Sequence, residues 1–246
     1  MLQNENIYLF LAILPIVSFL YSSVGHGGAS GYLALMALFS FAPESMKPTA
    51  LLLNLFVAGI SFFYYYREGY FNKKLFLVFA VASVPLAFIG GTIEVDAPIY
   101  KKILALLLIF AILKMLHVFG KENDQTKETR LWQGLVVGGV IGFFSGLIGI
   151  GGGIILTPVI LLLHWGNMKE AAAVSALFIW VNSAAGLTGQ LSSGITIEKE
   201  SFLLVGIALI GAVLGGYYGS KKINSQNLRY ILAFVLIIAS VKLFFT

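Results

Sequence analysis

Residues 131–153 read LWQGLVVGGVIGFFSGLIGIGGG, and this stretch decides the fold class. The part from 131 to 148 is almost entirely apolar and contains no Asp, Glu, Lys or Arg. An uncharged apolar run of this length is what a helix needs to cross the hydrocarbon core of a bilayer. Glycine inside a helix costs about 1 kcal/mol relative to alanine, so Gly149 and 151–153 predict a break directly after the run.

Comparable apolar runs cover nearly the whole chain. Of its 246 residues, 59% are hydrophobic and 11% are charged, whereas a soluble domain carries about 25% charged residues. This composition excludes a water-soluble domain. Only helices and closed barrels span lipid, and the alternating polar positions of a barrel strand are absent, so the sequence predicts an all-α polytopic membrane protein.

About ten hydrophobic segments are expected. Residues 28–42 and 152–165 are short for a spanning helix, so these two segments are expected to be tilted or re-entrant. The expected segments are residues 7–24, 28–42, 49–66, 75–91, 103–119, 131–148, 152–165, 171–191, 202–218 and 228–245.

The polar stretch 120–130 separates two copies of one unit. Gly25-His26-Gly27-Gly28-Ala29 aligns with Gly149-Ile150-Gly151-Gly152-Gly153, Met46-Lys47 with Met168-Lys169, Leu55-Phe56 with Leu177-Phe178, and Ser61 with Ser183. The order of these landmarks is the same in both halves. We therefore predict a first repeat at 1–119, a linker at 120–130 and a second repeat at 131–246.

Five segments in each copy is an odd number, so the second copy is expected to be inverted in the membrane, as in many secondary transporters. With alternating crossings, ten Lys and Arg residues fall in loops on one side and four on the other. The positive-inside rule then predicts a multi-pass membrane protein with both termini outside the cytoplasm. A non-crossing hairpin made by the first two segments of each copy gives the same parity, whereas a re-entrant second segment alone would put seven on each side.

The two glycine clusters are the first candidates for a binding site. Each cluster ends the first segment of its copy and begins the short second one, where a helix N-terminus presents unpaired N–H groups and the positive end of its dipole. These features make an anion site from backbone alone. Close packing or a plain tight turn is the alternative explanation. The candidate residues are Gly25, Gly27 and Gly28 in the first copy and Gly149, Gly151, Gly152 and Gly153 in the second.

Glycines also recur every four residues in two other segments. This small-xxx-small spacing lets helices approach closely in lipid, so we predict packing faces here, and such faces are compatible with a homodimer. The residues are Gly134, Gly138, Gly142 and Gly146, and then Gly211, Gly215 and Gly219.

Few polar side chains lie deep in the apolar runs. Asn54 and Ser61 are seven residues apart and share one face of their segment, and Asn182 and Ser183 lie in the matching segment of the second copy. They could donate hydrogen bonds to an anion or could simply join helices. His26 is the one titratable residue in a predicted break; it could bind an anion when protonated or carry a coupling proton, and a neutral histidine in a turn is the alternative.

The same sequence argues against several other classes of protein. The chain has no Cys, which removes disulfides and thiolate chemistry. No carboxylate lies within a predicted segment, which argues against an acid-based proton relay, a hard-metal site and an intramembrane enzyme. The formal net charge of +5 is explained by topology and contact with the lipid bilayer rather than by nucleic acid. We expect no cofactor and no metal.

Residues 146–158, GLIGIGGGIILTP, together with the duplication, resemble the TauE/SafE family of sulfite exporters and related permeases over essentially the whole chain. The first copy departs from the signature: His26 stands where an apolar residue is preferred, Ala29 replaces the last glycine, and Ala34 stands where Pro158 does. The resemblance implies transport of small sulfur-containing anions, such as sulfite or sulfonates, across a prokaryotic cytoplasmic membrane. Other members carry different oxyanions or carboxylates.

The working hypothesis is a secondary transporter that moves a small anionic substrate by alternating access. The paired glycine breaks would hold the anion with backbone N–H groups, and Asn54, Ser61, Asn182 and Ser183 would add side-chain hydrogen bonds. An anion channel of the same architecture is the main alternative. An intramembrane enzyme or a scaffold is the rival from another class, and it would need a buried nucleophile, acid or histidine cluster that the sequence does not supply.

Overall fold

The computed structural model describes residues 7–96, 98–100 and 129–222, together with a few isolated positions (102, 103, 105, 106, 109, 113, 127, 237 and 241). Most of the predicted segment 103–119, nearly all of the segment 228–245 and most of the linker 120–130 lie outside the described residues.

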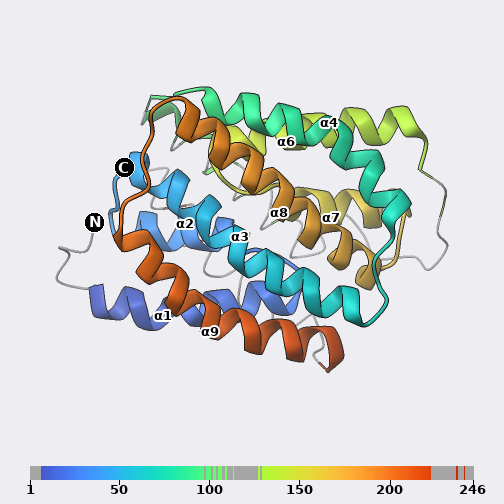
Figure 1. Cartoon of the computed structure of the whole chain (residues 1–246), viewed down its shortest axis with the longest axis horizontal. Helices are drawn as coiled ribbons and strands as arrows, with labels where there is room; N and C mark the ends of the chain where they lie inside the picture. Colours follow the sequence, from blue (N-terminus) through green and yellow to red (C-terminus); the bar gives the residue numbers. More distant parts are fainter. Residues whose placement is uncertain are drawn as a thin grey trace.

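The described part of the chain folds into helices joined by short loops, and it contains no strand (Figure 1). Five of the helices, α3, α4, α6, α8 and α9, are long and apolar enough to cross a membrane. The predicted all-α polytopic fold is therefore confirmed. The helices are α1 (Ile7–Ser23), α2 (Ala29–Leu38), α3 (Pro43–Arg67), α4 (Lys73–Thr92), α6 (Leu131–Ile148), α7 (Gly153–Leu162), α8 (Met168–Ser192) and α9 (Glu200–Lys221).

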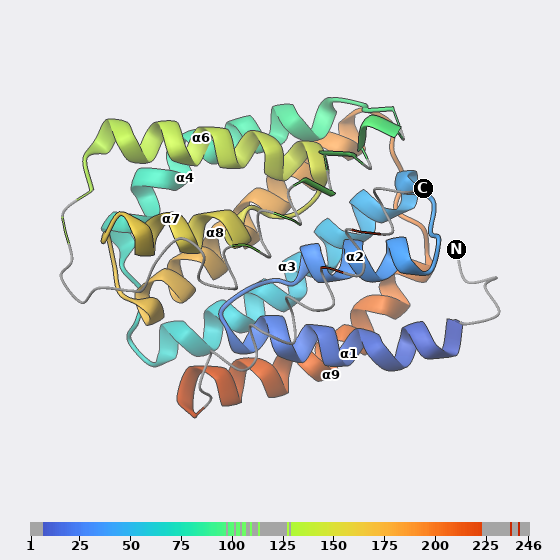
Figure 2. The same cartoon turned by 180° about the vertical axis from the view of Figure 1, so that it is seen from behind.

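The helices of the two halves match in length and order. The first helices have 17 and 18 residues, the second 10 and 10, the third 25 and 25, and the fourth 20 and 22. Corresponding helices run in opposite directions: α3 runs from left to right in Figure 1 and α8 from right to left, and Figure 2 shows the same for α1 and α6. Both observations support the proposal of inverted repeats.

The second helix of each half is too short to cross a bilayer. Ten residues of α-helix are about 15 Å long, which is half of the roughly 30 Å hydrocarbon core. In Figure 2, α2 returns toward the end of the bundle where α1 starts, and α7 returns toward the opposite end, where α6 starts. Each half therefore begins with a re-entrant hairpin, and the two hairpins enter the bundle from opposite ends.

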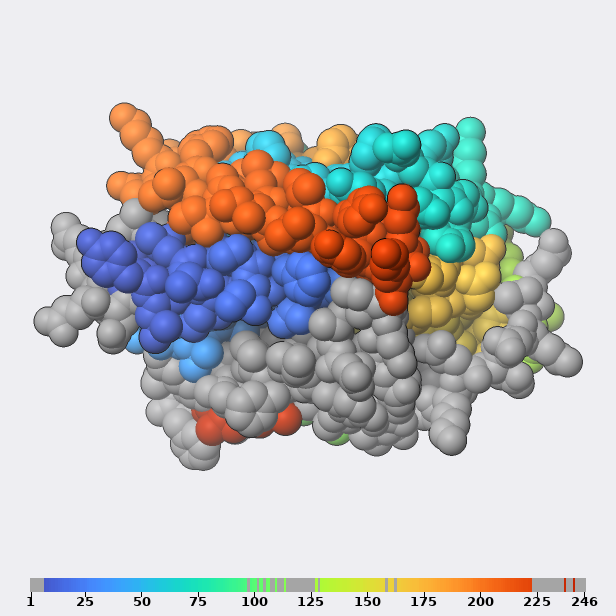
Figure 3. Space-filling model, turned by 90° about the horizontal axis from the view of Figure 1, so that it is seen from below, coloured from blue at the N-terminus to red at the C-terminus, as the bar shows by residue number. Residues whose placement is uncertain are grey.

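The two halves are interleaved rather than separate. The first helix of each half packs on the fourth helix of the other, so that α1 contacts α9 and α6 contacts α4; Figure 3 shows α1 and α9 side by side on one face. The glycine rows make these contacts. A Cβ on Gly211 would lie 1.9 Å from the carbonyl oxygen of Pro15, and a Cβ on Gly142 would lie 2.3 Å from that of Ser83. The predicted packing role of these rows is confirmed.

One boundary differs from the prediction in a way that matters for function. The third segment was expected to begin at Thr49, and Lys47 was expected in a loop. Helix α3 instead begins at Pro43, which sits in the first helical turn, where proline is favourable. Lys47 thereby lies inside the helix with only 7% of its surface exposed.

Candidate substrate site

Both hairpins turn at left-handed glycines. Gly28 caps the N-terminus of α2 with φ 98°, and Gly152 caps the N-terminus of α7 with φ 78°. A side chain strains this conformation, so glycine is required at both positions. The two helix starts predicted from the sequence are therefore present, and each lies in the buried interior.

The two breaks meet on the same pair of side chains. A Cβ on Gly27 would lie 2.4 Å from Asn54 Oδ1 and 2.8 Å from Ile179 Cγ2. A Cβ on Gly151 would lie 2.4 Å from Asn54 Nδ2, 2.8 Å from the same Ile179 atom and 3.0 Å from Ser183 Oγ. Asn54 comes from α3, and Ile179 and Ser183 come from α8. We call these five residues the central site.

Asn54 holds the central site together by hydrogen bonds. Its Oδ1 accepts from the backbone N–H of Ala29 at 3.1 Å, and its Nδ2 donates to Ser183 Oγ at 3.1 Å. The side chain is fully buried. Asn54 thus supplies an oxygen to the positive N-terminus of α2, a position that favours an oxygen acceptor.

The second break retains unused hydrogen-bond donors. Within the part of the chain that the structure describes, the backbone N–H groups of Gly151, Gly152 and Gly153 donate to no protein acceptor. The hydroxyl of Ser145 is buried without a partner there as well, and its Cβ would lie 3.6 Å from a Cβ on Gly152. The N-terminus of α7 therefore offers several unused donors, which is the chemistry of an anion site.

His26 belongs to a separate hydrogen-bonded row beside the first break. Its Nδ1 lies 2.9 Å from the carbonyl oxygen of Val24, and its Nε2 lies 3.2 Å from Thr157 Oγ1 of α7. Thr157 donates in turn to Ser175 Oγ of α8 at 2.7 Å. The carbonyl can only accept, so Nδ1 carries a proton. Thr157 has a single hydroxyl proton, so while it donates to Ser175 its oxygen can only accept from a protonated Nε2, and it can donate to the Nε2 of a neutral ring only by giving up the bond to Ser175. The ring therefore joins the two hairpins.

The structure does not bring the two remaining side-chain candidates to the central site. Ser61 donates to the carbonyl oxygen of Ser22 at 3.0 Å and so joins α3 to the end of α1. Asn182 donates to the carbonyl oxygen of Phe178 at 2.8 Å within its own helix, and its Oδ1 is a buried acceptor without a partner among the described residues. A free acceptor does not suit an anion. Both residues act as interhelical or intrahelical polar contacts in this conformation.

Three residues of this region were not among the candidates predicted from the sequence. Ile179 was missed because an apolar residue in an apolar run gives no signal. Thr157 and Ser145 carry a signal, since each is a hydroxyl residue in a nearly continuous apolar segment. The described residues hold no cluster of three His, Asp or Glu side chains that could bind a metal ion.

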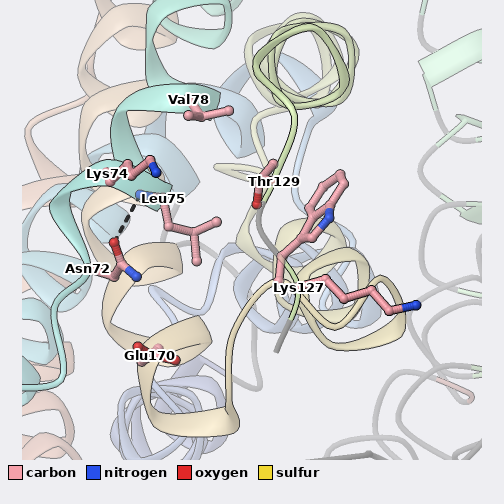
Figure 4. Close-up of a pocket in the computed structure, with 8 residues that line it drawn as sticks. Asn72, Lys74, Leu75, Val78, Lys127, Thr129 and Glu170 are labelled. Atoms are coloured by element: carbon pink, nitrogen blue, oxygen red, sulfur yellow. Dashed lines mark hydrogen bonds between the residues drawn. The ribbon is translucent and has the colours of Figure 1, made fainter. Parts of the chain in front are cut away.

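A separate pocket opens at one end of the bundle, near the starts of α4 and α8 (Figure 4). Its volume is about 210 Å³. The residues that line it are Asn72, Lys74, Leu75, Val78, Lys127, Thr129, Trp165 and Glu170. None of them belongs to either break. Glu170 already caps α8 together with Asn167, so we assign the pocket no part in the central site.

The fold and the central site together define the class. Two re-entrant hairpins that enter an apolar helical bundle from opposite ends and meet in its interior are typical of membrane transporters. The family comparison agrees: the model described as "Sulfite exporter TauE/SafE" matches residues 9–243. The chain belongs to the TauE/SafE family of membrane transporters.

Similar proteins are found in distant prokaryotes. The chain is 34% identical over 247 residues to "Probable membrane transporter protein y4hK" of Sinorhizobium fredii, covering 98% of this chain and 99% of that protein. It is 28% identical to a "Probable membrane transporter protein" of Methanocaldococcus jannaschii, with 93% of each chain covered. It is 25% identical to "Probable membrane transporter protein YfcA" of Escherichia coli K12, covering 96% and 87%. No solved structure matches the chain.

Proposed function

We propose that this protein is a secondary transporter that carries a small oxyanion of the sulfite and organosulfonate class across the cell membrane. The observation that carries the proposal is the meeting of two helix N-termini at the central site, with Asn54 between Gly27 and Gly151. One N-terminus binds the side-chain oxygen of Asn54, and the other retains the unused N–H groups of 151–153. An oxyanion would bind where these donors converge.

The charge of the region supports an anionic substrate. Residues 20–34 and 145–160 contain no Asp or Glu, so no carboxylate at either break repels an anion. The fields of two helix N-termini favour negative charge at the same place. The description of the matching family, which names sulfite, supports this class of anion.

The filled interior favours a carrier over a channel. Asn54 and Ile179 occupy the space between the two breaks, and Asn54, Ser183 and Ile179 have at most 2% of their surface exposed. An anion can pass only if the hairpins separate from α3 and α8, first on one side and then on the other. That motion is alternating access.

The membrane potential supplies a driving force for export. The cell interior is negative relative to the outside, whichever way the protein is oriented. An anion leaving the cell then gains about 2.3 kcal/mol per charge for each 100 mV. Export therefore needs no co-transported ion on energetic grounds.

Counterflow in proteoliposomes tests the function. Vesicles with the purified protein are loaded with unlabelled sulfite and diluted into a trace of labelled sulfite. A carrier transiently accumulates the label, and the initial rate saturates with concentration. Unitary currents carried by sulfite would instead indicate a channel, and the absence of both, for methanesulfonate as well as sulfite, would contradict the proposal.

Asn54→Asp tests the location of the site. The carboxylate can still accept from Ala29 N–H and from the Ser183 hydroxyl, but it places negative charge where the anion would bind. We expect sulfite counterflow to fall at least tenfold while the protein still elutes as a single species in detergent. Counterflow at the wild-type rate would show that the anion binds elsewhere.

A further inference from the structure

The matched lysines of the two repeats, Lys47 and Lys169, differ in what binds them. Lys47 lies near the start of α3, and Lys169 lies near the start of α8. Because these two helices run in opposite directions (Figure 1), the two lysines lie toward opposite ends of the bundle. Each is positioned to control one approach to the central site.

The ammonium group of Lys169 has hydrogen-bond partners within the protein. Its ammonium group donates to the carbonyl oxygens of Gly219 and Ser220 at the end of α9, each at 3.0 Å. It also lies 5.5 Å from the centre of the Tyr65 ring and 5.6 Å from that of Tyr70, within the range of cation–π attraction. The contacts of Lys169 therefore tie the start of α8 to the end of α9 and to Tyr65 and Tyr70, and leave this ammonium group with no need of a ligand.

Lys47 has no such partners. It is 7% exposed, yet its ammonium group makes no hydrogen bond or ion pair with any residue that the structure describes. The acid that acts on it electrostatically is Glu94, in the exposed loop after α4. An ammonium group on a side chain that is mostly removed from solvent favours a nearby acceptor or an opposite charge. Lys47 is therefore available to a negatively charged ligand.

Gln190 of α8 is a second unsatisfied group at the same end of the bundle. Its side chain is fully buried, and neither Oε1 nor Nε2 has a hydrogen-bond partner in the described structure. A buried primary amide that makes no hydrogen bond is costly, and in native proteins such a group usually binds water, an ion or a ligand. Its two N–H groups suit an oxyanion.

The contacts between α3 and α8 place Lys47 and Gln190 at the same height along the two antiparallel helices. Asn54 bonds to Ser183, and one turn further a Cβ on Gly186 would lie 3.4 Å from Leu51 Cδ1. The next turn of each antiparallel helix carries Lys47 and Gln190. Each is seven residues from its partner in the central site, which is about 10 Å along the helix.

The second break adjoins this level as well. A Cβ on Gly149 would lie 3.2 Å from the carbonyl oxygen of Lys47 and 3.3 Å from its Cα. Lys47 is therefore next to the hairpin whose N–H groups remain unused. An anion bound at Lys47 is about two helical turns from the central site and borders the backbone that would receive it.

We propose that Lys47 and Gln190 form a site for the substrate oxyanion at one mouth of the pathway, on the side of the membrane where Glu94 and the loop 193–199 lie. We call it the entry site: an imported anion enters through it, and an exported anion leaves through it. The Lys47 ammonium group attracts the anion, the Gln190 amide donates hydrogen bonds to it, and the negative charge of the Glu94 carboxylate on the same side opposes its binding. This proposal rests on the proposed function, since it assumes an oxyanion substrate.

Sulfite binding to the detergent-purified protein tests the entry site by titration calorimetry. Lys47→Gln removes the charge and keeps most of the length, and we expect the dissociation constant for sulfite to rise at least tenfold. Gln190→Leu should raise it three- to tenfold. Lys199→Gln is the matched control, because Lys199 is an exposed lysine at the same end, and we expect less than a twofold change.

Glu94→Gln gives an independent measurement that does not depend on the folding of a core variant, because Glu94 is exposed. Removing the competing carboxylate should tighten sulfite binding two- to fivefold. The entry site is overturned if Glu94→Gln leaves the dissociation constant unchanged, or if a folded Lys47→Gln protein binds sulfite as the wild type does. Wild-type protein that neither binds nor exchanges sulfite or methanesulfonate would overturn the proposed function and the entry site together.

Discussion

Asn54 fills the space between the two glycine breaks and bonds to the groups that line it. An asparagine amide has an acceptor and a donor at the same end, so it can accept from the start of α2 and donate to Ser183 of α8 at once. No apolar side chain could satisfy both groups in this buried position. When the substrate enters, its oxygen can take over the bond to Ala29 N–H, and the Asn54 amide can turn toward the anion.

At Gly27 a side chain would cause a steric clash without straining the backbone. The φ of Gly27 lies outside the left-handed region, yet a Cβ there would lie 2.4 Å from Asn54 Oδ1. Gly27→Ala should therefore displace Asn54 and reduce sulfite counterflow at least tenfold. Gly206→Ala, on α9 with nothing within 4 Å, is the control and should transport normally. Equal rates in the two variants would mean that the first break takes no part in transport.

Thr157 connects the hairpins through His26 and Ser175, and its contribution can be measured directly. Thr157→Val keeps the shape but removes the hydroxyl, leaving His26 Nε2 and Ser175 without this partner. We expect a loss of about 1–3 kcal/mol in unfolding free energy, seen as a lower unfolding temperature. Thr188→Val serves as the comparison, since Thr188 is exposed and bonds only within its own helix. Similar losses for both variants would contradict the structural role of Thr157.

Close helix contacts in this protein depend on glycines, where the absence of a side chain lets two backbones touch. Gly211 of α9 admits the carbonyl oxygen of Pro15 to 1.9 Å from where its Cβ would be, whereas Gly206 on the same helix faces open space. Gly211→Leu should separate α9 from α1 and cost about 1–3 kcal/mol or more. Gly206→Leu should be neutral in the same thermal unfolding assay. A neutral Gly211→Leu would argue against the observed contact between α1 and α9.

Hydropathy predicted the helices well where a long apolar run coincides with the whole element, as for α6, and less well where a helix begins with polar residues. The start of α3 at Pro43 was missed because Glu44, Ser45 and Lys47 interrupt the apolar pattern. Ser45 is accommodated by a tertiary contact, its hydrogen bond to Glu198 in the loop before α9. A sequence window contains no information on such contacts, so Lys47 was placed in a loop.

Sequence symmetry also overstated the symmetry of the site. Ser61 and Ser183 align, but Ser183 accepts from Asn54 whereas Ser61 bonds to the backbone of α1. In the same register Asn54 aligns with Ala176, so the second repeat has no equivalent amide. The paired glycine breaks followed from backbone requirements that both repeats share. The side chains between them depend on how the two halves pack, which a single sequence does not reveal.

The interleaving of the halves means that neither can complete the site alone. Gly27 belongs to the first half and lies against Ile179 of the second, while Gly151 belongs to the second and lies against Asn54 of the first. The tips of both hairpins lie against α3 and α8, and these two helices also contact each other. A small rotation of one half against the other would therefore open one hairpin while the opposite one stays packed, as alternating access requires.

The two ends of α4 provide the test of topology. The natural chain has no Cys, so single cysteines can be labelled without background. Lys74 and Glu94 are both exposed and lie at the start of α4 and just after its end. We expect a membrane-impermeant maleimide to label Glu94→Cys in intact cells and Lys74→Cys only after permeabilisation, because the loop charges place Lys74 inside. Labelling of both in intact cells would contradict a membrane-spanning α4, and the reverse pattern would retain the fold but invert its orientation and with it the side of the Lys47 entry site.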